Sequence, residues 1–135
     1  MARSNFEGLQ VYQLAERLAD EIWIITSRWD QFAKQTVGRQ LVRACDSIGA
    51  NIAEGTGRGT YLDNHRFVLV ARGSLHETKH WLRRAYRRKL LAPEQIDRLR
   101  EILDNLSPML NAYRKSLVKA HSEQRTGSDR SATNY

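Results

Sequence analysis

The sequence lacks the features that several classes of protein require. Among its 135 residues it has one cysteine, Cys45, so an intramolecular disulfide is impossible and a disulfide-rich secreted domain is excluded. No uncharged apolar run approaches the ~20 residues that a membrane-spanning helix needs, and the first residues lack the apolar stretch of a signal peptide. Runs of alternating apolar and polar residues, which indicate half-buried strands, are also missing. We therefore expect a cytoplasmic protein without strands and without a membrane partner.

Apolar residues recur at helical spacing in four segments. Steps of three and four residues place the members of each set on one face of a helix. The sets are Val11, Ala15, Leu18, Ile22, Ile25 and Trp29; Val37, Leu41, Ala44, Ile48 and Ile52; Val68, Ala71, Leu75, Thr78, Leu82 and Ala85; and Ile96, Leu99, Leu103, Leu106, Leu110, Tyr113 and Leu117. Because the connections between them are short, the sequence predicts an all-α fold, an antiparallel up-down four-helix bundle over residues 1–119.

Turn and capping residues predict where the helices begin and end. Gln35 or Thr36 starts the second helix, and Gly55 follows it as a C-terminal capping glycine. Pro93 suits the first turn of the fourth helix, whereas Pro108 lies inside this helix and predicts a bend. Residues 120–135 are polar with few apolar residues, which predicts a disordered C-terminal tail.

The net charge of +7 is concentrated in one segment. Between residues 65 and 89 there are eight lysines and arginines and one acid, whereas the rest of the chain has 14 basic and 14 acidic residues. Five residues of this segment lie on one side of the predicted third helix, at steps of four, three, four and four: Arg72, His76, Lys79, Arg83 and Arg87. The stripe would be about 22 Å long, which is comparable to several phosphate spacings of a nucleic acid.

The basic stripe therefore predicts a polyanion partner, RNA or DNA. We expect the phosphate contacts to come from Arg72, Lys79, Arg83, Arg84, Arg87 and Arg88, with Arg43 and Arg58 as weaker candidates. Trp81 or Tyr86 beside the stripe would stack on an unpaired base. The alternative is a basic surface that serves solubility alone.

The segment 76–80 reads His-Glu-Thr-Lys-His, an H-E-x-x-H pattern typical of zinc proteases. Its two histidines would share one face of a helix, but its lysine together with Arg72 and Arg83 would repel a divalent cation. No third histidine follows at a suitable spacing, and Glu101 is the only downstream acid at a plausible distance. We predict no metal, no cofactor and no catalytic residue.

Four aromatic residues lie beside the predicted core positions: Tyr12, Trp23, Trp81 and Tyr86. In a wide bundle they would simply cover the ends of the core. Alternatively they form a second apolar face through which copies of the chain associate, and we predict this interface.

Three stretches resemble a known family of four-helix bundles. They are "LQVYQLAERLADEIW", "QLVRACDSIGANIAEGTGR" from Gln40 to Arg58, and "FVLVARGSLHETKHWLRRA" from Phe67 to Ala85. The family is the one named for proteins encoded within intervening sequences of large-subunit ribosomal RNA genes. The similarity runs from Phe6 to Lys119. This chain departs from the family pattern at one place. Many members have a proline before the Asn-Ile-Ala-Glu-Gly run, whereas residues 48–50 of this chain are Ile-Gly-Ala.

The resemblance to this family leads to further expectations for this chain. It implies a homo-oligomer, a pentameric ring in known members, and no enzymatic activity. A related branch consists of accessory proteins of diversity-generating retroelements, which bind nucleic acid and a reverse transcriptase. The alternative function is therefore a protein-interaction scaffold, such as the accessory subunit of a reverse transcriptase.

Overall fold

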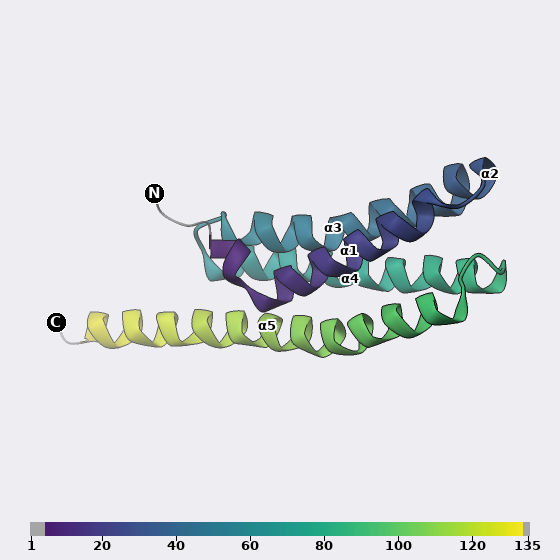
Figure 1. Cartoon of the computed structure of the whole chain (residues 1–135). Coiled ribbons are helices and arrows are strands. Elements are labelled where there is room, and N and C mark those ends of the chain that lie inside the picture. Colours follow the sequence, from purple (N-terminus) through teal and green to yellow (C-terminus); the bar gives the residue numbers. More distant parts are fainter. Residues whose placement is uncertain (1–4, 134–135) are drawn as a thin grey trace.

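The structure is a computed structural model that describes residues 5–133, and within this range every regular element is a helix. In chain order the elements are η1 (Asn5–Gly8), α1 (Gln10–Ser27), α2 (Gln31–Ala33), η2 (Lys34–Gly38), α3 (Arg39–Thr56), α4 (Tyr61–Arg87) and α5 (Pro93–Thr133). Figure 1 shows that the four long helices α1, α3, α4 and α5 run alternately in opposite directions. The predicted all-α, up-down four-helix bundle is confirmed.

The contacts between helices define a ring of neighbours. α1 packs against α3 and α5, and α4 packs against the same two helices, so α1 and α4 lie diagonally across the bundle. The side of the bundle between α1 and α3 is therefore opposite to the side between α4 and α5. Within residues 5–133, none of the helices combines the length and low charge that a bilayer crossing requires.

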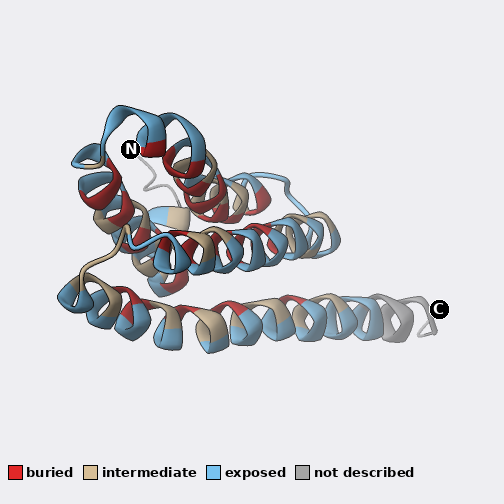
Figure 2. Cartoon of the chain, turned by 90° about the vertical axis from the view of Figure 1, so that its right-hand side faces the viewer, coloured by how far each residue is buried: buried red, intermediate tan, exposed pale blue. Residues whose placement is uncertain are grey.

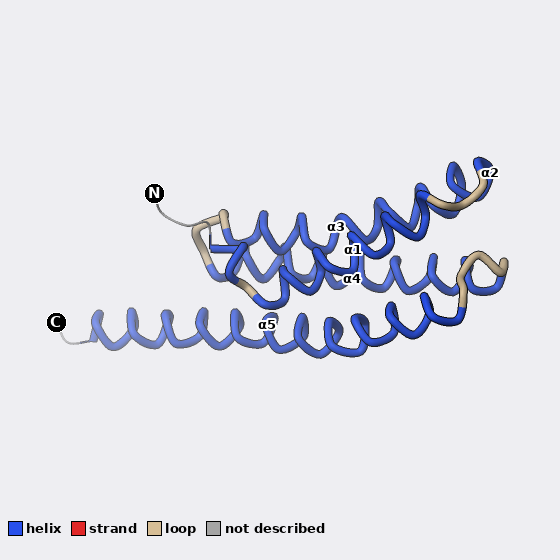
Figure 3. The backbone as a smooth tube through the Cα atoms, in the orientation of Figure 1, coloured by secondary structure: helices blue, strands red, loops and turns tan. Residues whose placement is uncertain are grey.

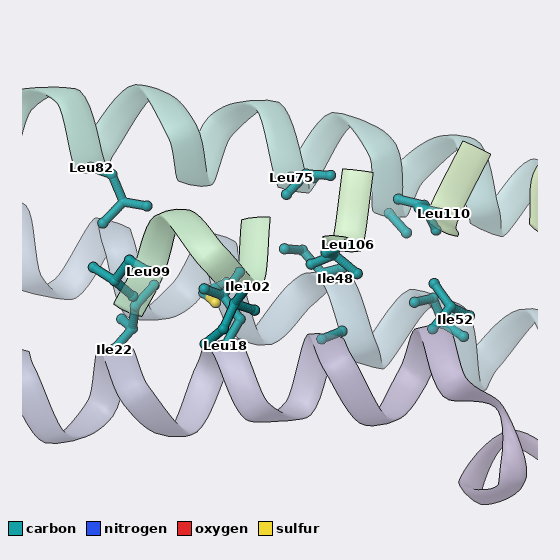
Figure 4. Close-up of a cluster of buried hydrophobic side chains, with 14 of the residues drawn as sticks. Leu18, Ile22, Ile48, Ile52, Leu75, Leu82, Leu99, Ile102, Leu106 and Leu110 are labelled. Atoms are coloured by element: carbon teal, nitrogen blue, oxygen red, sulfur yellow. The ribbon is translucent and has the colours of Figure 1, made fainter. Parts of the chain in front are cut away.

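The core consists of the apolar seams that the sequence predicts. Each helix is buried along one face and exposed along the other (Figure 2). Leucine and isoleucine side chains from all four long helices meet in the centre (Figure 4). One core residue of α5, Ile102, does not belong to the predicted seam, whereas Leu103 and Tyr113 are only half-buried. Cys45 is completely buried, and burial together with nearby Asp46 raises the pKa of its thiol far above its usual value.

The second long helix starts earlier than predicted. α2, the π-helical turn η2 and α3 follow one another without a break from Gln31 to Thr56. The Asp30 side chain caps this start, because its Oδ1 accepts a hydrogen bond from the backbone N–H of Ala33 at 3.0 Å. The apolar period begins only at Val37, so periodicity alone placed the start near Gln35 or Thr36. The capping residue Asp30 therefore indicates the start of this helix better than the apolar periodicity does.

Gly55 lies inside α3 rather than after it, so its predicted role as a capping glycine is wrong. The residue is buried against the first turns of α4. A β-carbon at this position would lie 3.1 Å from the backbone oxygen of Asn64 and 3.1 Å from Cβ of Phe67, and closer still to Oδ1 of Asn64. The position therefore needs glycine because α3 and α4 approach each other closely here.

α5 extends beyond the predicted end of the bundle. Among the residues of α5 whose burial is described, up to Gly127, Leu117 is the last buried one, with exposed side chains from Ser122 to Gly127, and the helix continues through Thr133. The segment 120–133, predicted to be disordered, is instead helical and continues α5 without a proline to interrupt it. Residues 134–135 of the predicted tail lie outside the described residues. Pro108 lies within α5, whose path curves in its first half, as the prediction of a bend requires (Figures 1 and 3).

The loop between α4 and α5 contains a residue in the left-handed region. Lys89 has a φ of 61°, its N–H donates to the Tyr86 carbonyl at 3.1 Å, and the N–H of Leu90 donates to the Ala85 carbonyl at 2.9 Å. These two bonds form the helix-ending motif in which glycine is preferred at the left-handed position.

We expect Lys89→Gly to raise the free energy of unfolding by about 0.5–1 kcal/mol, because glycine adopts this backbone conformation without the clash of a β-carbon. Urea unfolding followed by circular dichroism measures the change. Lys89→Ala is the matched control, since it removes the same charge but keeps the β-carbon. An equal gain in the alanine variant would assign the effect to the charge and contradict the backbone argument.

Candidate nucleic-acid interface

The packing of α4 fixes which of its side chains face outward. Val68, Ala71, Leu75, Thr78, Leu82 and Ala85 are buried against the core. The residues that directly follow these buried positions in the chain lie on the outer side of the helix and are exposed, including Arg72, Lys79 and Arg83. Arg87 is also exposed, at the end of the helix. The basic stripe predicted for the third helix thus lies on the surface of α4.

The cations of this stripe have no acidic partner within the described chain. The ion pairs there join Arg58 to Glu54, Arg66 to Asp63, Arg98 to Glu21 and Lys119 to Glu123, and none of them includes a predicted phosphate contact at positions 72–88. Their positive field is felt by His65 on the same helix. Burial lowers the pKa of His65, and the charges of Arg114 and Arg72 lower it further. The exposed surface of α4 between positions 72 and 88 therefore has an excess of positive charge.

A groove of about 630 Å³ runs between α4 and α5. Its walls carry Lys79, Arg83 and Tyr86 from α4 and Arg100, Asp104 and Ser107 from α5. Its floor is apolar and consists of Leu82, Leu91, Ile96, Leu99 and Leu103. Three cations and one carboxylate thus surround a surface of leucine and isoleucine.

Two of the predicted phosphate contacts point away from this groove. Consecutive residues of a helix are about 100° apart, so Arg84 and Arg88 are displaced around α4 from Arg83 and Arg87. Arg84 is half-buried, and Arg88, just after the helix, borders a hollow with Phe32 and Leu90.

The two weaker candidates lie elsewhere. Arg43 belongs to α3 and borders a hollow between α1 and α3, together with Trp23 and Val42. It is therefore on the opposite side of the bundle from the groove between α4 and α5. Arg58 follows α3, pairs with Glu54 at 3.6 Å and lies 5.0 Å from the ring centre of Phe67. The structure does not gather these two residues with the α4 stripe.

The four aromatic residues predicted to form an oligomer interface do not all lie on one side of the bundle. Tyr12 and Trp23 border hollows between α1 and α3, where Trp23 is 63% exposed. Trp81 is half-buried on α4, and its Nε1 donates to Glu77 at 3.4 Å. Tyr86 borders the groove between α4 and α5 and is 59% exposed. They do not form one continuous patch within a single chain.

The H-E-x-x-H residues make contacts unlike those of a zinc site. His76 and His80 are exposed, the ring of His80 packs edge-on against Trp81 at 4.9 Å, and Glu77 accepts the bond from Trp81. Within the described residues, no group of three histidines, cysteines or carboxylates is arranged to hold a metal ion.

Sequence reasoning missed two basic residues of this side, Arg100 and Arg114 of α5. Arg100 lines the groove, and Arg114, held by bonds from its Nε and Nη2 to Asn111 Oδ1 at 3.2 and 2.9 Å, influences His65. The only signal for them was their position next to the core seam of α5. Which neighbouring helix they face follows from the packing and not from the pattern.

Comparisons with known proteins agree with this architecture. The model of a family described as 23S rRNA-intervening sequence protein matches residues 7–112. A crystal structure from Bacteroides thetaiotaomicron, described as a protein with unknown function from the S23 ribosomal protein family, superposes with a TM-score of 0.61. It is 22% identical, and the alignment covers 82% of this chain and 97% of that one. At this identity the similarity shows the fold alone. No curated protein matches the chain.

Proposed function

The chain belongs to the 23S rRNA-intervening sequence protein family, and we propose that it is a non-enzymatic protein that binds the backbone of a nucleic acid. The contacts come from the α4 side of the bundle, through Arg72, Lys79, Arg83 and Arg87, with Arg100 and Arg114 of α5 beside them. Arg84 and Arg88 extend the basic surface around α4. The ligand is RNA or DNA, and no cofactor takes part.

One observation carries the proposal: the cations at positions 72–88 are unpaired with acids in the described chain, although the chain has 15 carboxylate residues. Exposed cations that serve solubility are usually interspersed with acids. Here they are concentrated on one helix, where a row of phosphates would replace the missing counter-charges and release bound ions.

The double variant Arg83→Ala with Arg87→Ala tests the proposal. Two lost phosphate contacts should weaken binding to all sequences alike and flatten the slope of log affinity against log salt concentration by about 2. Fluorescence anisotropy with labelled RNA over a series of salt concentrations measures both effects.

Arg39→Ala with Arg43→Ala is the matched control, because it removes two charges from α3 on the opposite side of the bundle. Its salt slope should stay close to that of the unaltered protein. If the slope of log affinity against log salt concentration flattens equally in both double variants, binding depends on net charge and not on α4, and the proposed interface is wrong.

The proposal includes self-association in the cytoplasm into a ring-shaped homo-oligomer, with a pentamer as the expected size. Apolar side chains left exposed in the single chain support it, chiefly Trp23 and Phe32, which are 63% and 78% exposed. Light scattering with and without RNA measures the subunit number.

A protein-interaction scaffold is the second candidate function, for instance an accessory subunit of a reverse transcriptase. The hollow between α1 and α3 favours a protein partner, since it has a volume of about 500 Å³ and contains the exposed Trp23. A reverse transcriptase gene beside this gene, with template and variable repeats, would favour the scaffold. Location inside a ribosomal RNA gene would favour the first function.

A further inference from the structure

The groove between α4 and α5 combines two properties that a backbone-binding surface does not need. Contacts to phosphates require only exposed cations, yet this groove has an apolar floor that includes the half-buried Leu91, Ile96 and Leu103. Tyr86 stands at its edge with most of its ring exposed. The volume of about 630 Å³ lies within the range usual for sites that enclose part of a ligand.

We infer that this groove takes unpaired nucleotides of a single-stranded nucleic acid, with a base on the apolar floor against Tyr86 and its phosphates at Lys79, Arg83 and Arg100. The inference rests on the proposed function and narrows its ligand. A base has an apolar face that stacks on an aromatic ring, and its phosphates carry the charge that the three cations match. The single carboxylate of the groove, Asp104, leaves its charge positive.

A double helix cannot use the groove in this way, because its bases are stacked inside and present only their edges. Its phosphates would still reach the exposed cations. We therefore expect the α4 side to bind both forms, and the groove to add affinity for the single strand alone.

The cations outside the groove distinguish a polynucleotide from a small amphipathic anion. Arg72 and Arg87 lie on the same stripe on either side of Lys79 and Arg83, so the positive charge extends for about 22 Å along α4. A ligand with one anionic group would occupy only part of this length. A polynucleotide, which has a phosphate at every nucleotide, would occupy the whole length.

Tyr86→Ala tests the inference. We expect the affinity for a short labelled RNA strand to fall about tenfold and the affinity for the same strand annealed to its complement to change less than about twofold. Tyr86→Phe keeps the ring and should retain the affinity. Tyr61→Ala is the matched control, since it makes the same change at an exposed tyrosine of α4, 43% exposed, that lies outside the groove. A DNA strand of the same sequence, measured alongside, shows which sugar the site accepts.

Several results would overturn the inference. If Tyr86→Ala changes neither affinity while Arg83→Ala with Arg87→Ala lowers both, the groove holds no base and the proposed function stands. Equal binding of single strand and duplex by the unaltered protein leads to the same conclusion. If a leucine- and glutamate-rich amphipathic peptide binds in a Tyr86-dependent manner and RNA does not, the groove is a protein site. If neither nucleic acid form binds, the proposed function fails as well.

Discussion

Gly55→Ala is expected to lower the free energy of unfolding by about 1–3 kcal/mol, although it adds a single methyl group and improves helix propensity. The new β-carbon would meet the Asn64 carbonyl oxygen and Cβ of Phe67, both at 3.1 Å. Both neighbours belong to the backbone framework of α4 and cannot rotate away. The helices would therefore have to separate at this contact. Urea unfolding at one fixed protein concentration measures the loss.

Gly73→Ala is the control, and we expect it to change the free energy of unfolding in the opposite direction. This glycine is exposed in the middle of α4, and a β-carbon there would meet no atom within 4 Å. Helix propensity alone then decides the outcome, and we expect a gain of about 0.5–1 kcal/mol. If the two alanine variants changed stability in the same direction, close contact between α3 and α4 would not be the reason for glycine at position 55.

Leu106→Ala is expected to lower the free energy of unfolding by about 2–5 kcal/mol. Leu106 has no exposed surface, and Figure 4 shows its side chain on α5 directed towards Ile48 of α3 in the centre of the core. Truncation removes the buried methyl groups and leaves a cavity enclosed by neighbouring helices. The upper part of the range applies if the helices cannot move inward to fill it. Thermal and urea unfolding both report the change.

Leu62→Ala is the matched change on the surface, because Leu62 of α4 is 50% exposed. We expect its effect to stay within about 0.5 kcal/mol. A loss at Leu62 as large as the loss at Leu106 would mean that Leu62 is covered in solution by another copy of the chain. An effect at Leu106 below about 1 kcal/mol would contradict the close packing described for the core.

The sequence was informative wherever one local rule decided the structure. Apolar periodicity predicted the four long helices and most of their buried residues, and the exposure of the cations on α4 followed from the same phase. Prediction from periodicity failed where a capping residue also determined a helix end, or where two segments distant in the sequence came into contact. The start at Gln31 depended on a cap by Asp30, and the role of Gly55 depended on the approach of α4.

The candidate site was predictable in part for the same reason. A single helix determines the stripe, so Arg72, Lys79 and Arg83 were found together. The groove is made by two helices, and nothing in the spacing of residues 61–87 indicates that Arg100 and Leu103 face them. Likewise, the separation of Arg43 from the stripe follows from which helices are diagonal in the bundle, and this depends on the packing of all four.

The burial of Cys45 provides a probe of the native state. Its thiol has no exposed surface, and its raised pKa disfavours the thiolate, which is the form that attacks an alkylating reagent. Alkylation of the folded chain therefore requires that the bundle first open around α3. Because Cys45 is the only cysteine, the rate at which a maleimide labels the protein reports how often this opening occurs, without any denaturant.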